Sequence, residues 1–193
     1  MKFKITFLMF LGIVILLSSC NFFESSSSKK LTSMNKELTN LNKKYKNTKI
    51  DLSLNLYTKV FKGKTQSNLS MLIYYDANCS TCFTKLKNWK GNLDYFKEID
   101  KKLNIKFILY SNDSLNTNIN LKKTNFPKSL IAYDKDNSYL KKYEHVTEYA
   151  YNTMLLNKNN EIIFIGSPQV SSNLRKHYTK LIKQQGVNRK AFK

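Results

Sequence analysis

The sequence predicts an α/β sandwich with a central mixed sheet, and three features in a fixed order predict it. Two apolar runs, Leu69–Asp76 and Ile105–Asp113, flank a helical segment, which indicates a parallel strand pair with a right-handed crossover. Two shorter apolar runs, Thr153–Leu156 and Ile162–Ile165, flank a polar turn and indicate an antiparallel hairpin. Apolar residues at helical spacing over Val170–Gln184 predict a closing helix. With 193 residues, the chain is long enough for one such domain with its own core.

The first segment, "MKFKITFLMFLGIVILLSSC", is typical of an export signal over residues 1–19. It starts with two lysines, and its apolar run from Ile5 to Leu17 is short for a membrane span. The tetrad that ends at Cys20 resembles the lipobox of bacterial lipoproteins. That resemblance implies cleavage before Cys20, lipid on its sulfur, and an exported protein anchored in the bacterial cell envelope by this lipid. An uncleaved signal anchor is the alternative.

Residues 20–30 are rich in serine and predict a tether between the anchor and the domain. Residues 31–64 predict a helical or extended lead-in, followed by the main domain at 65–193. Apolar residues in the lead-in recur at spacings of three and four, namely Leu31, Met34, Leu38, Leu41 and Tyr45. They indicate an amphipathic helix, with a polar linker as the alternative.

Further elements are expected between the first strand and the hairpin. A helix is predicted over Ser80–Lys90, and the pattern allows its extension to Lys102 with a break near Gly91. The run Ser129–Asp134 predicts another strand, and a short helix is expected near Asn137–Tyr143. The predicted order is thus strand, helix, strand, connector, hairpin and helix.

The chain carries a formal net charge of +20, mostly from lysine. Such a surface favours anionic partners such as lipid head groups. The lysines are scattered among Asn and Ser instead of forming a basic-aromatic stripe, and basicity alone does not identify a nucleic-acid reader. A general bias of the composition toward Lys and Asn accounts for the charge, so no nucleic-acid partner is predicted, and membrane contact is expected through the lipid anchor.

Cys79 and Cys82 follow the first strand in "YYDANCSTCFTKLKNW". Cys82 continues, one turn earlier, the helical series Leu86, Trp89, Leu93 and Phe96, so it is expected on the buried face. Cys79 is expected at the helix N-terminus, with Ser80 and Thr81 in the first turn. Free N–H groups and the helix dipole favour a thiolate there. This predicts an exposed attacking thiol and a shielded resolving thiol.

Other charged groups and metal ligands are expected to matter little here. Lys85 and Lys87 should add only distant, screened positive charge to the attacking thiol. A structural zinc site needs more ligands than these two cysteines, and the surroundings of His145 and His177 are not ligand-like. His177 is expected to face solvent, and His145 is expected in a solvated loop. No metal or other cofactor is predicted.

From about Thr65 to Gln185 the chain resembles thioredoxin-fold proteins, specifically the TlpA-like membrane-tethered thiol-disulfide oxidoreductases. The carrying segments are "MLIYYDANCSTC", "NFPKSLIAYDKDNSYLKKYEHV" and "YNTMLLNKNNEIIFIGSP". The second segment matches that branch's connector at Phe126, Pro127, Asp134 and Tyr143, and the third matches its terminal hairpin. The resemblance implies a thioredoxin-like sandwich flanked by helices, with Cys79 as nucleophile and Cys82 as resolving cysteine.

Two departures from that family concern the supporting residues. Asn78 stands where the family usually has Trp, directly before the first cysteine. The family's cis-proline before the hairpin is missing, and its place falls near Tyr151. A cis bond without proline costs about 2.5–4 kcal/mol, so a trans peptide and a reshaped loop are expected there.

The leading hypothesis is a lipid-anchored oxidoreductase that cycles a Cys79–Cys82 dithiol and disulfide. Its partners would be protein thiols and disulfides of the envelope and an unknown protein that recycles the site. The alternative is a thioredoxin-like binding or scaffold lipoprotein with a structural disulfide. A peroxidase is disfavoured because the residues before Cys79 lack the peroxiredoxin pattern. A copper chaperone is disfavoured because Tyr149 stands about where its histidine ligand belongs.

Overall fold

The structure is a computed structural model that describes residues 28–51 and 68–188. The chain divides into two compact units, Met1–Leu41 and Asn42–Lys193. Residues 28–45 are helical, so the apolar series of the lead-in does form a helix, and this helix begins within the last three residues of the stretch predicted as a tether. The export signal and Cys20 lie outside the described residues, so both stay predictions. Within the described residues, no helix combines the length and the apolar character needed to cross a membrane.

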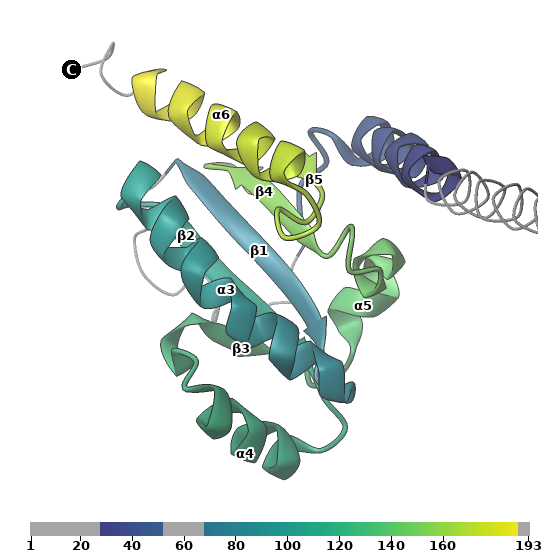
Figure 1. Cartoon of the computed structure of the whole chain (residues 1–193), viewed down its shortest axis with the longest axis vertical. Helices are drawn as coiled ribbons and strands as arrows, with labels where there is room; N and C mark the ends of the chain where they lie inside the picture. The colour runs from purple at the N-terminus through teal and green to yellow at the C-terminus, as the bar shows by residue number, and fades with distance from the viewer. Residues whose placement is uncertain (1–27, 52–67, 189–193) are drawn as a thin grey trace, which may run out of the picture. The chain divides into compact units, whose positions relative to one another are not determined.

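The second unit is built on a five-stranded mixed sheet in the order β3-β2-β1-β4-β5 (Figure 1). β1 pairs in parallel with β2 and antiparallel with β4, so it is the central strand. β2 pairs in parallel with β3, and β4 pairs antiparallel with β5. The strand bounds are Leu69–Asp76, Asn104–Tyr110, Ile131–Tyr133, Thr153–Asn157 and Ile162–Ile165 for β1 to β5. This arrangement confirms the predicted thioredoxin-like α/β fold.

The helices cover both faces of this sheet. α3 (Ser80–Ile99), α4 (Ser114–Thr124) and α6 (Ser172–Asn188) contribute side chains to the same core cluster as the odd-numbered residues of β1. The crossovers through α3 and α4 both step outward from β1, and right-handed crossovers in one direction place their helices on one face. α5 (Ser138–Lys142) covers the other face, where the Tyr139 ring stacks on Tyr74 of β1 at 5.7 Å between centroids.

α4 was not predicted from the sequence. Only two of its residues are buried, Thr117 and Leu121, so it has almost no apolar periodicity. Its ends are well defined, because the Asp113 side chain accepts a hydrogen bond from the Asn116 N–H and Asn125 adopts a left-handed conformation. These capping residues were the available sequence signal.

The other elements follow the predictions with small differences at their ends. α3 runs without a break through Gly91 to Ile99, so the break allowed near that glycine is absent, and a Cβ added there would meet open space. The predicted strand at Ser129–Asp134 is shorter, since Lys128–Leu130 form a 3-10 turn before β3.

Asparagine occupies the left-handed backbone positions among the described non-glycine residues, namely Asn47, Asn125, Asn137 and Asn160. Asn160 lies in the hairpin turn between β4 and β5. In the same turn the Asn157 side-chain oxygen accepts hydrogen bonds from the N–H groups of Asn159 and Glu161, at 2.9 and 3.0 Å. The turn therefore depends on short amides instead of glycine.

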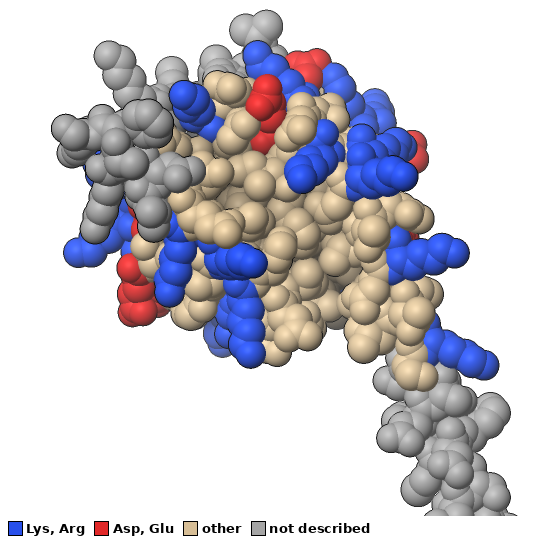
Figure 2. Space-filling view, turned by 90° about the horizontal axis from the view of Figure 1, so that it is seen from above, with Lys and Arg blue, Asp and Glu red and all other residues tan. Residues whose placement is uncertain are grey.

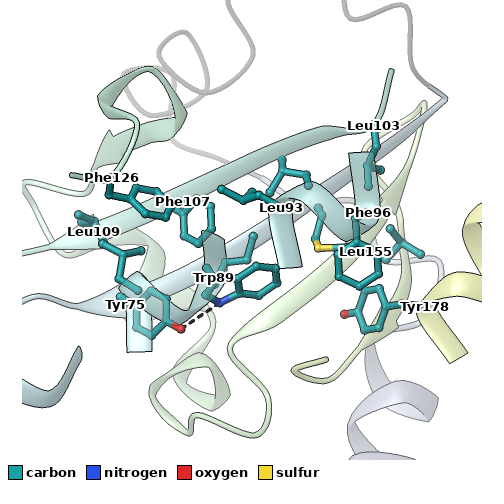
Figure 3. Packing of buried hydrophobic residues seen from close by; sticks show 14 of the residues in the cluster. Tyr75, Trp89, Leu93, Phe96, Leu103, Phe107, Leu109, Phe126, Leu155 and Tyr178 are labelled. Carbon is teal, nitrogen blue, oxygen red and sulfur yellow. Dashed lines mark hydrogen bonds between the residues drawn. The ribbon is translucent and has the colours of Figure 1, made fainter. Parts of the chain in front are cut away.

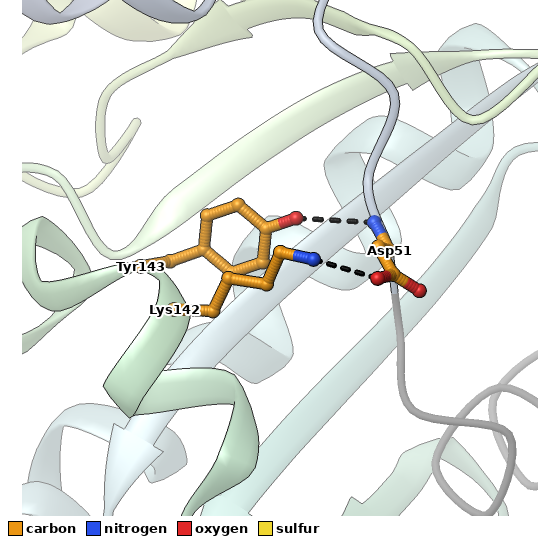
Figure 4. Close-up of polar contacts among 3 residues, drawn as sticks. All are labelled: Asp51, Lys142 and Tyr143. Atoms are coloured by element: carbon orange, nitrogen blue, oxygen red, sulfur yellow. Dashed lines mark hydrogen bonds and ion pairs between the residues drawn. The ribbon is translucent and has the colours of Figure 1, made fainter.

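The end of the lead-in, from Asn42 onward, belongs to the second unit and contacts its sheet and connector. Asn42 exchanges two hydrogen bonds with the backbone of Ile165 in β5, of 2.8 and 2.9 Å. Further along, the Asp51 N–H donates to the Tyr143 hydroxyl at 3.0 Å, and the Asp51 carboxylate pairs with Lys142 at 2.6 Å (Figure 4). The lead-in thus reaches both the edge strand and the connector before β4.

Surface charge agrees with the scattered lysines of the sequence. On the face drawn in Figure 2, Lys and Arg side chains lie around the margins of a large area of other residues and do not form one continuous stripe. Asp and Glu side chains on this face are few.

The core centres on Trp89 of α3, which is fully buried (Figure 3). Its indole N–H donates to the Tyr75 hydroxyl of β1 at 3.0 Å, and its ring meets Phe107 of β2 edge-on at 5.5 Å. Phe107 in turn packs against Phe126 at 4.8 Å, so one of the connector residues in the family resemblance belongs to this core. α3 is therefore fixed to the sheet through its indole as well as by apolar packing.

A Tyr75→Phe variant should lower the free energy of unfolding by about 1–3 kcal/mol, because it leaves the buried Trp89 N–H without an acceptor. Urea unfolding followed by circular dichroism measures this change. Tyr95→Phe is the matched control, since Tyr95 is exposed and its hydroxyl shares a 2.9 Å hydrogen bond with Thr179. If both variants lost the same free energy of unfolding, the buried Trp89–Tyr75 hydrogen bond would have no special role in stability.

Candidate redox site

Cys79 lies between the end of β1 and the start of α3. Its backbone is extended, with φ −92° and ψ 122°, and Ser80 is the first residue of the helix. The Cys79 carbonyl accepts a hydrogen bond from the Cys82 N–H at 3.1 Å, which closes the first turn. Cys79 is exposed and Cys82 is half-buried, and both are free thiols. The strand-to-helix junction thus places the two cysteines one turn apart, as the motif spacing predicted.

The Cys79 sulfur has a hydroxyl partner in the same turn. Its Sγ lies 3.0 Å from the Thr81 Oγ1. This hydrogen bond and, after it, one from the Cys82 thiol lower the pKa of Cys79 to about 7. About half of the Cys79 side chains would therefore be thiolate at pH 7. The sequence argument relied on backbone N–H groups and the helix dipole, whereas the leading partner is the Thr81 hydroxyl.

Cys82 has the opposite environment. It packs against the apolar core cluster, and this burial is the main reason that its pKa rises to about 12. The hydrogen bond to Cys79 and the charges of Cys79 and Asp76 raise it further, while the positive charge of Lys85 lowers it. The pair therefore combines an accessible, readily ionised sulfur with a shielded sulfur that holds its proton.

Asn78 connects the cysteine turn to the next strand. Its side-chain oxygen accepts from the Asn112 N–H at 2.9 Å, just beyond β2. Its backbone N–H and its side-chain amide both donate to the Asp76 carboxylate, at 3.0 and 2.8 Å. Asn78 therefore braces the turn through hydrogen bonds.

Tyr151 occupies the loop before β4, where the family would have its cis-proline. It is buried, its N–H donates to the Glu148 carbonyl at 2.9 Å, and the described residues contain no cis peptide bond. The next residue, Asn152, exchanges two hydrogen bonds with the backbone of Tyr74 in β1, of 2.8 and 2.9 Å. The loop is thereby anchored to the central strand, and its peptide bond is trans, as expected.

Lys85 and Tyr149 are site residues whose importance the sequence analysis missed. The Lys85 ammonium lies 4.2 Å from the centroid of the Tyr149 ring. The Tyr149 hydroxyl donates to the Gln169 side-chain oxygen at 2.6 Å, and the Tyr75 hydroxyl donates to the same oxygen at 3.1 Å. The available sequence signal concerned Lys85 alone. It lies three residues after Cys82, and this spacing makes Lys85 and Cys82 neighbours on one face of the helix.

The histidines and potential metal ligands lie apart from this chemistry. His145 is half-buried against the Tyr45 ring at 4.8 Å, so the expectation of a solvated loop histidine was wrong. Burial, with the charge of Lys44, lowers its pKa to about 4. His177 is exposed on α6, as expected. Among the described residues, no three His, Cys, Asp or Glu side chains are grouped to hold a metal ion.

A cavity of about 230 Å³ opens near the carboxyl ends of β2 and β3. Leu109 and Tyr133 supply apolar surface, and Ser111, Ser114 and Asn118 of the α4 region add polar groups. The adjacent residue Asn112 binds Asn78, so the cavity and the cysteine turn share one end of the sheet. Crevices at the carboxyl ends of parallel strands commonly receive ligands.

A Thr81→Val variant should raise the pKa of Cys79 from about 7 toward the usual ~8.5, because the leading hydrogen bond to the sulfur is lost. At pH 7 the thiolate fraction falls, so alkylation of Cys79 by iodoacetamide should slow about fivefold. Mass spectrometry of samples quenched across pH 5–9 gives the rate at each cysteine.

Thr84→Val is the control, because Thr84 is exposed on the same helix and should leave the Cys79 profile unchanged. A Cys79 profile that does not move in Thr81→Val would show that the Thr81 hydroxyl does not set its pKa.

Comparison with known proteins gives structural likeness only. No family model matches the chain, and no curated protein matches it. The chain is similar to a solved thioredoxin-like protein from Parabacteroides distasonis, with 15% identity, a TM-score of 0.46, and coverage of 60% of this chain and 88% of the other. It is also similar to the thioredoxin domain of a thiol-disulfide oxidoreductase from Bacteroides vulgatus, with 15% identity, a TM-score of 0.43, and coverage of 58% and 81%. The N-terminal domain of PilB from Neisseria meningitidis matches with 11% identity, a TM-score of 0.45, and coverage of 64% and 84%.

Proposed function

We propose that this protein is a thiol-disulfide oxidoreductase that cycles Cys79 and Cys82 between dithiol and disulfide. The observation that carries the proposal is that two thiols one helical turn apart have pKa values shifted in opposite directions. The exposed Cys79 has its pKa lowered to about 7, and the half-buried Cys82 has its pKa raised to about 12. This difference selects Cys79 as the first attacking sulfur, because the thiolate is the attacking species in thiol-disulfide exchange.

The reaction follows from this asymmetry. In the reductive direction the Cys79 thiolate attacks one sulfur of a partner's disulfide, and the partner's other sulfur leaves as a thiolate. Cys82 then loses its proton and attacks Cys79, which forms the Cys79–Cys82 disulfide and releases the partner in reduced form. Two electrons pass from the protein to its partner. The reverse sequence oxidises a partner dithiol, and a second protein restores the starting state.

We propose that the partners are protein thiols and disulfides of the bacterial cell envelope, and that the protein acts as a reductant or as an electron carrier for specific partners. The buried Tyr151 loop supports specificity, since it differs from the proline loop that holds extended substrate chains in the family resemblance. The competing function is a binding or scaffold protein with a structural disulfide. It is weakened because so small a disulfide loop adds little stability.

The Cys79/Cys82 couple should exchange readily, with a reduction potential between about −300 and −120 mV, the span of working oxidoreductases. Equilibration of residues 21–193, which lack Cys20, with defined thiol buffers, followed by thiol trapping, measures this potential. Cys79→Ser should abolish exchange, and Cys82→Ser should accumulate mixed disulfides at Cys79. A bond that resists reduction below this range, or thiols that do not pair, would favour the scaffold.

We also propose that Cys20 carries the lipid that holds the protein at the membrane, in line with the lipobox-like tetrad that ends there. Expression of the full chain with a labelled fatty acid in a bacterial host should label the protein, and Cys20→Ala should remove the label. Label that persists in Cys20→Ala would show attachment elsewhere. An unlabelled full chain that stays in the membrane fraction would indicate the uncleaved signal anchor.

A further inference from the structure

We propose that Lys85 is the cation that promotes ionisation of Cys82 in the resolving step, and that the Tyr149 ring holds Lys85 in place for this purpose. The inference rests on the proposed function and adds two residues to it. Neither belongs to the cysteine motif, and they come from segments far apart in the sequence. Their placement beside the shielded thiol gives that thiol a means of losing its proton.

The first support is the placement of Lys85 on α3. Residues three apart on a helix are neighbours on one face, so Lys85 follows Cys82 along the half-buried side of α3. Lys85 itself is half-buried, unlike the exposed Lys87 two residues later. Partial burial matters because a charge that is shielded from water and salt acts more strongly on its neighbours.

The second support is the contact with Tyr149. The Lys85 ammonium lies 4.2 Å from the centroid of the Tyr149 ring, well within the range of about 6 Å in which a ring face attracts a cation. A lysine side chain on a helix surface otherwise samples many rotamers. The ring therefore restricts where the ammonium can lie.

The third support is that the Tyr149 ring is itself fixed. Its hydroxyl donates to Gln169 at 2.6 Å, and Tyr75 donates to the same Gln169 oxygen at 3.1 Å. Tyr75 in turn accepts from the buried Trp89 indole at 3.0 Å. This chain of hydrogen bonds joins β1, α3 and the loops before β4 and α6. The position of Lys85 is thereby set by the core of the domain.

The charges near Cys82 explain why a cation is needed. Burial opposes its ionisation, as do the negative charges of Cys79 and Asp76, whereas Lys85 favours it. The nearby phenols of Tyr75 and Tyr149 stay neutral, because burial raises the pKa of each. Once Cys79 is bound to a partner's sulfur, its thiolate charge is gone. Burial and Asp76 then still oppose ionisation of Cys82, and Lys85 still favours it. The share of Lys85 in the total effect on Cys82 is therefore greatest in the resolving step.

In the resolving step one S–S bond forms and another breaks. Cys82 releases its proton to solvent, and its thiolate forms a bond to the Cys79 sulfur. The bond between Cys79 and the partner's sulfur breaks, and that sulfur leaves as a thiolate that takes a proton from water. The Lys85 ammonium keeps its proton throughout and acts only through its charge.

The test uses the reduced protein, residues 21–193, which lack Cys20 and so carry only the Cys79 and Cys82 thiols, and the aromatic disulfide dithionitrobenzoate in a stopped-flow spectrometer. Release of the first thionitrobenzoate depends on reagent concentration and reports attack by Cys79. Release of the second is independent of concentration and reports attack by Cys82. One trace thus separates the two thiols, and the second phase is the one that Lys85 should affect.

Lys85→Met should slow the second phase about threefold at pH 7 and leave the first phase nearly unchanged. Loss of a neighbouring cation raises the pKa of Cys82 by about one unit, which lowers its thiolate fraction tenfold. A more basic thiolate is also intrinsically more nucleophilic, which offsets about 0.4 to 0.5 of a decade of this loss and leaves about threefold. The pH profile of the second phase should shift upward by the same unit.

Three further variants separate charge from structure. Lys85→Arg keeps the cation and should retain the wild-type second phase. Tyr149→Leu removes the ring and should also slow the second phase. Combined with Lys85→Met, it should slow that phase little beyond the effect of Lys85→Met alone. Lys87→Met is the matched control on the same helix and should change neither phase.

The outcomes distinguish the inference from the proposed function. If the wild-type protein shows no second phase, Cys82 does not resolve the mixed disulfide and the proposed function fails. If it shows a second phase that is equally fast in Lys85→Met, the proposed function stands and the inference is overturned. A second phase slowed equally by Lys85→Met and Lys87→Met would also overturn it, because net charge alone would then explain the effect.

Discussion

The hydrogen bond from the Trp89 indole to the Tyr75 hydroxyl is the contact on which the geometry of the site depends. It joins the helix that carries both cysteines to the central strand that precedes them. The Tyr75 hydroxyl then continues to Gln169, which also holds Tyr149. A buried N–H without an acceptor is costly, so this connection allows few alternative positions for α3. The cysteine turn is therefore presented on a rigid base.

The two thiols show how one turn of helix can produce different chemistry at each end. Cys79 precedes the first residue of the helix, where solvent and the Thr81 hydroxyl stabilise its thiolate. Cys82 belongs to the helix and faces the core, where burial keeps it protonated. The same helix start therefore creates both the reactive and the resolving sulfur, and the difference between them follows from the burial of Cys82 and from the Thr81 hydroxyl beside Cys79.

Much of the fold could be predicted from the sequence because β1, α3 and the hairpin carry strong apolar patterns. The placement of Cys82 on the buried face followed from the spacing to Trp89 and is present in the structure. α4 could not be found in this way, since its stability depends on caps and on Leu121 more than on an apolar stripe. The burial of His145 also escaped prediction, because its partner Tyr45 lies a hundred residues earlier. Long-range partners such as Tyr149 for Lys85 leave no periodic signal.

The asparagines in left-handed turns affect the unfolded chain as well as the folded one. Glycine is the usual choice for such positions, yet this protein has five glycines in 193 residues and uses Asn47, Asn125, Asn137 and Asn160 instead. A glycine leaves the unfolded backbone more freedom to lose, so each asparagine lowers the entropic cost of folding while its amide offsets part of the strain. A composition rich in asparagine is therefore compatible with sharply turning loops, and the chain reaches a compact fold from a less disordered starting ensemble.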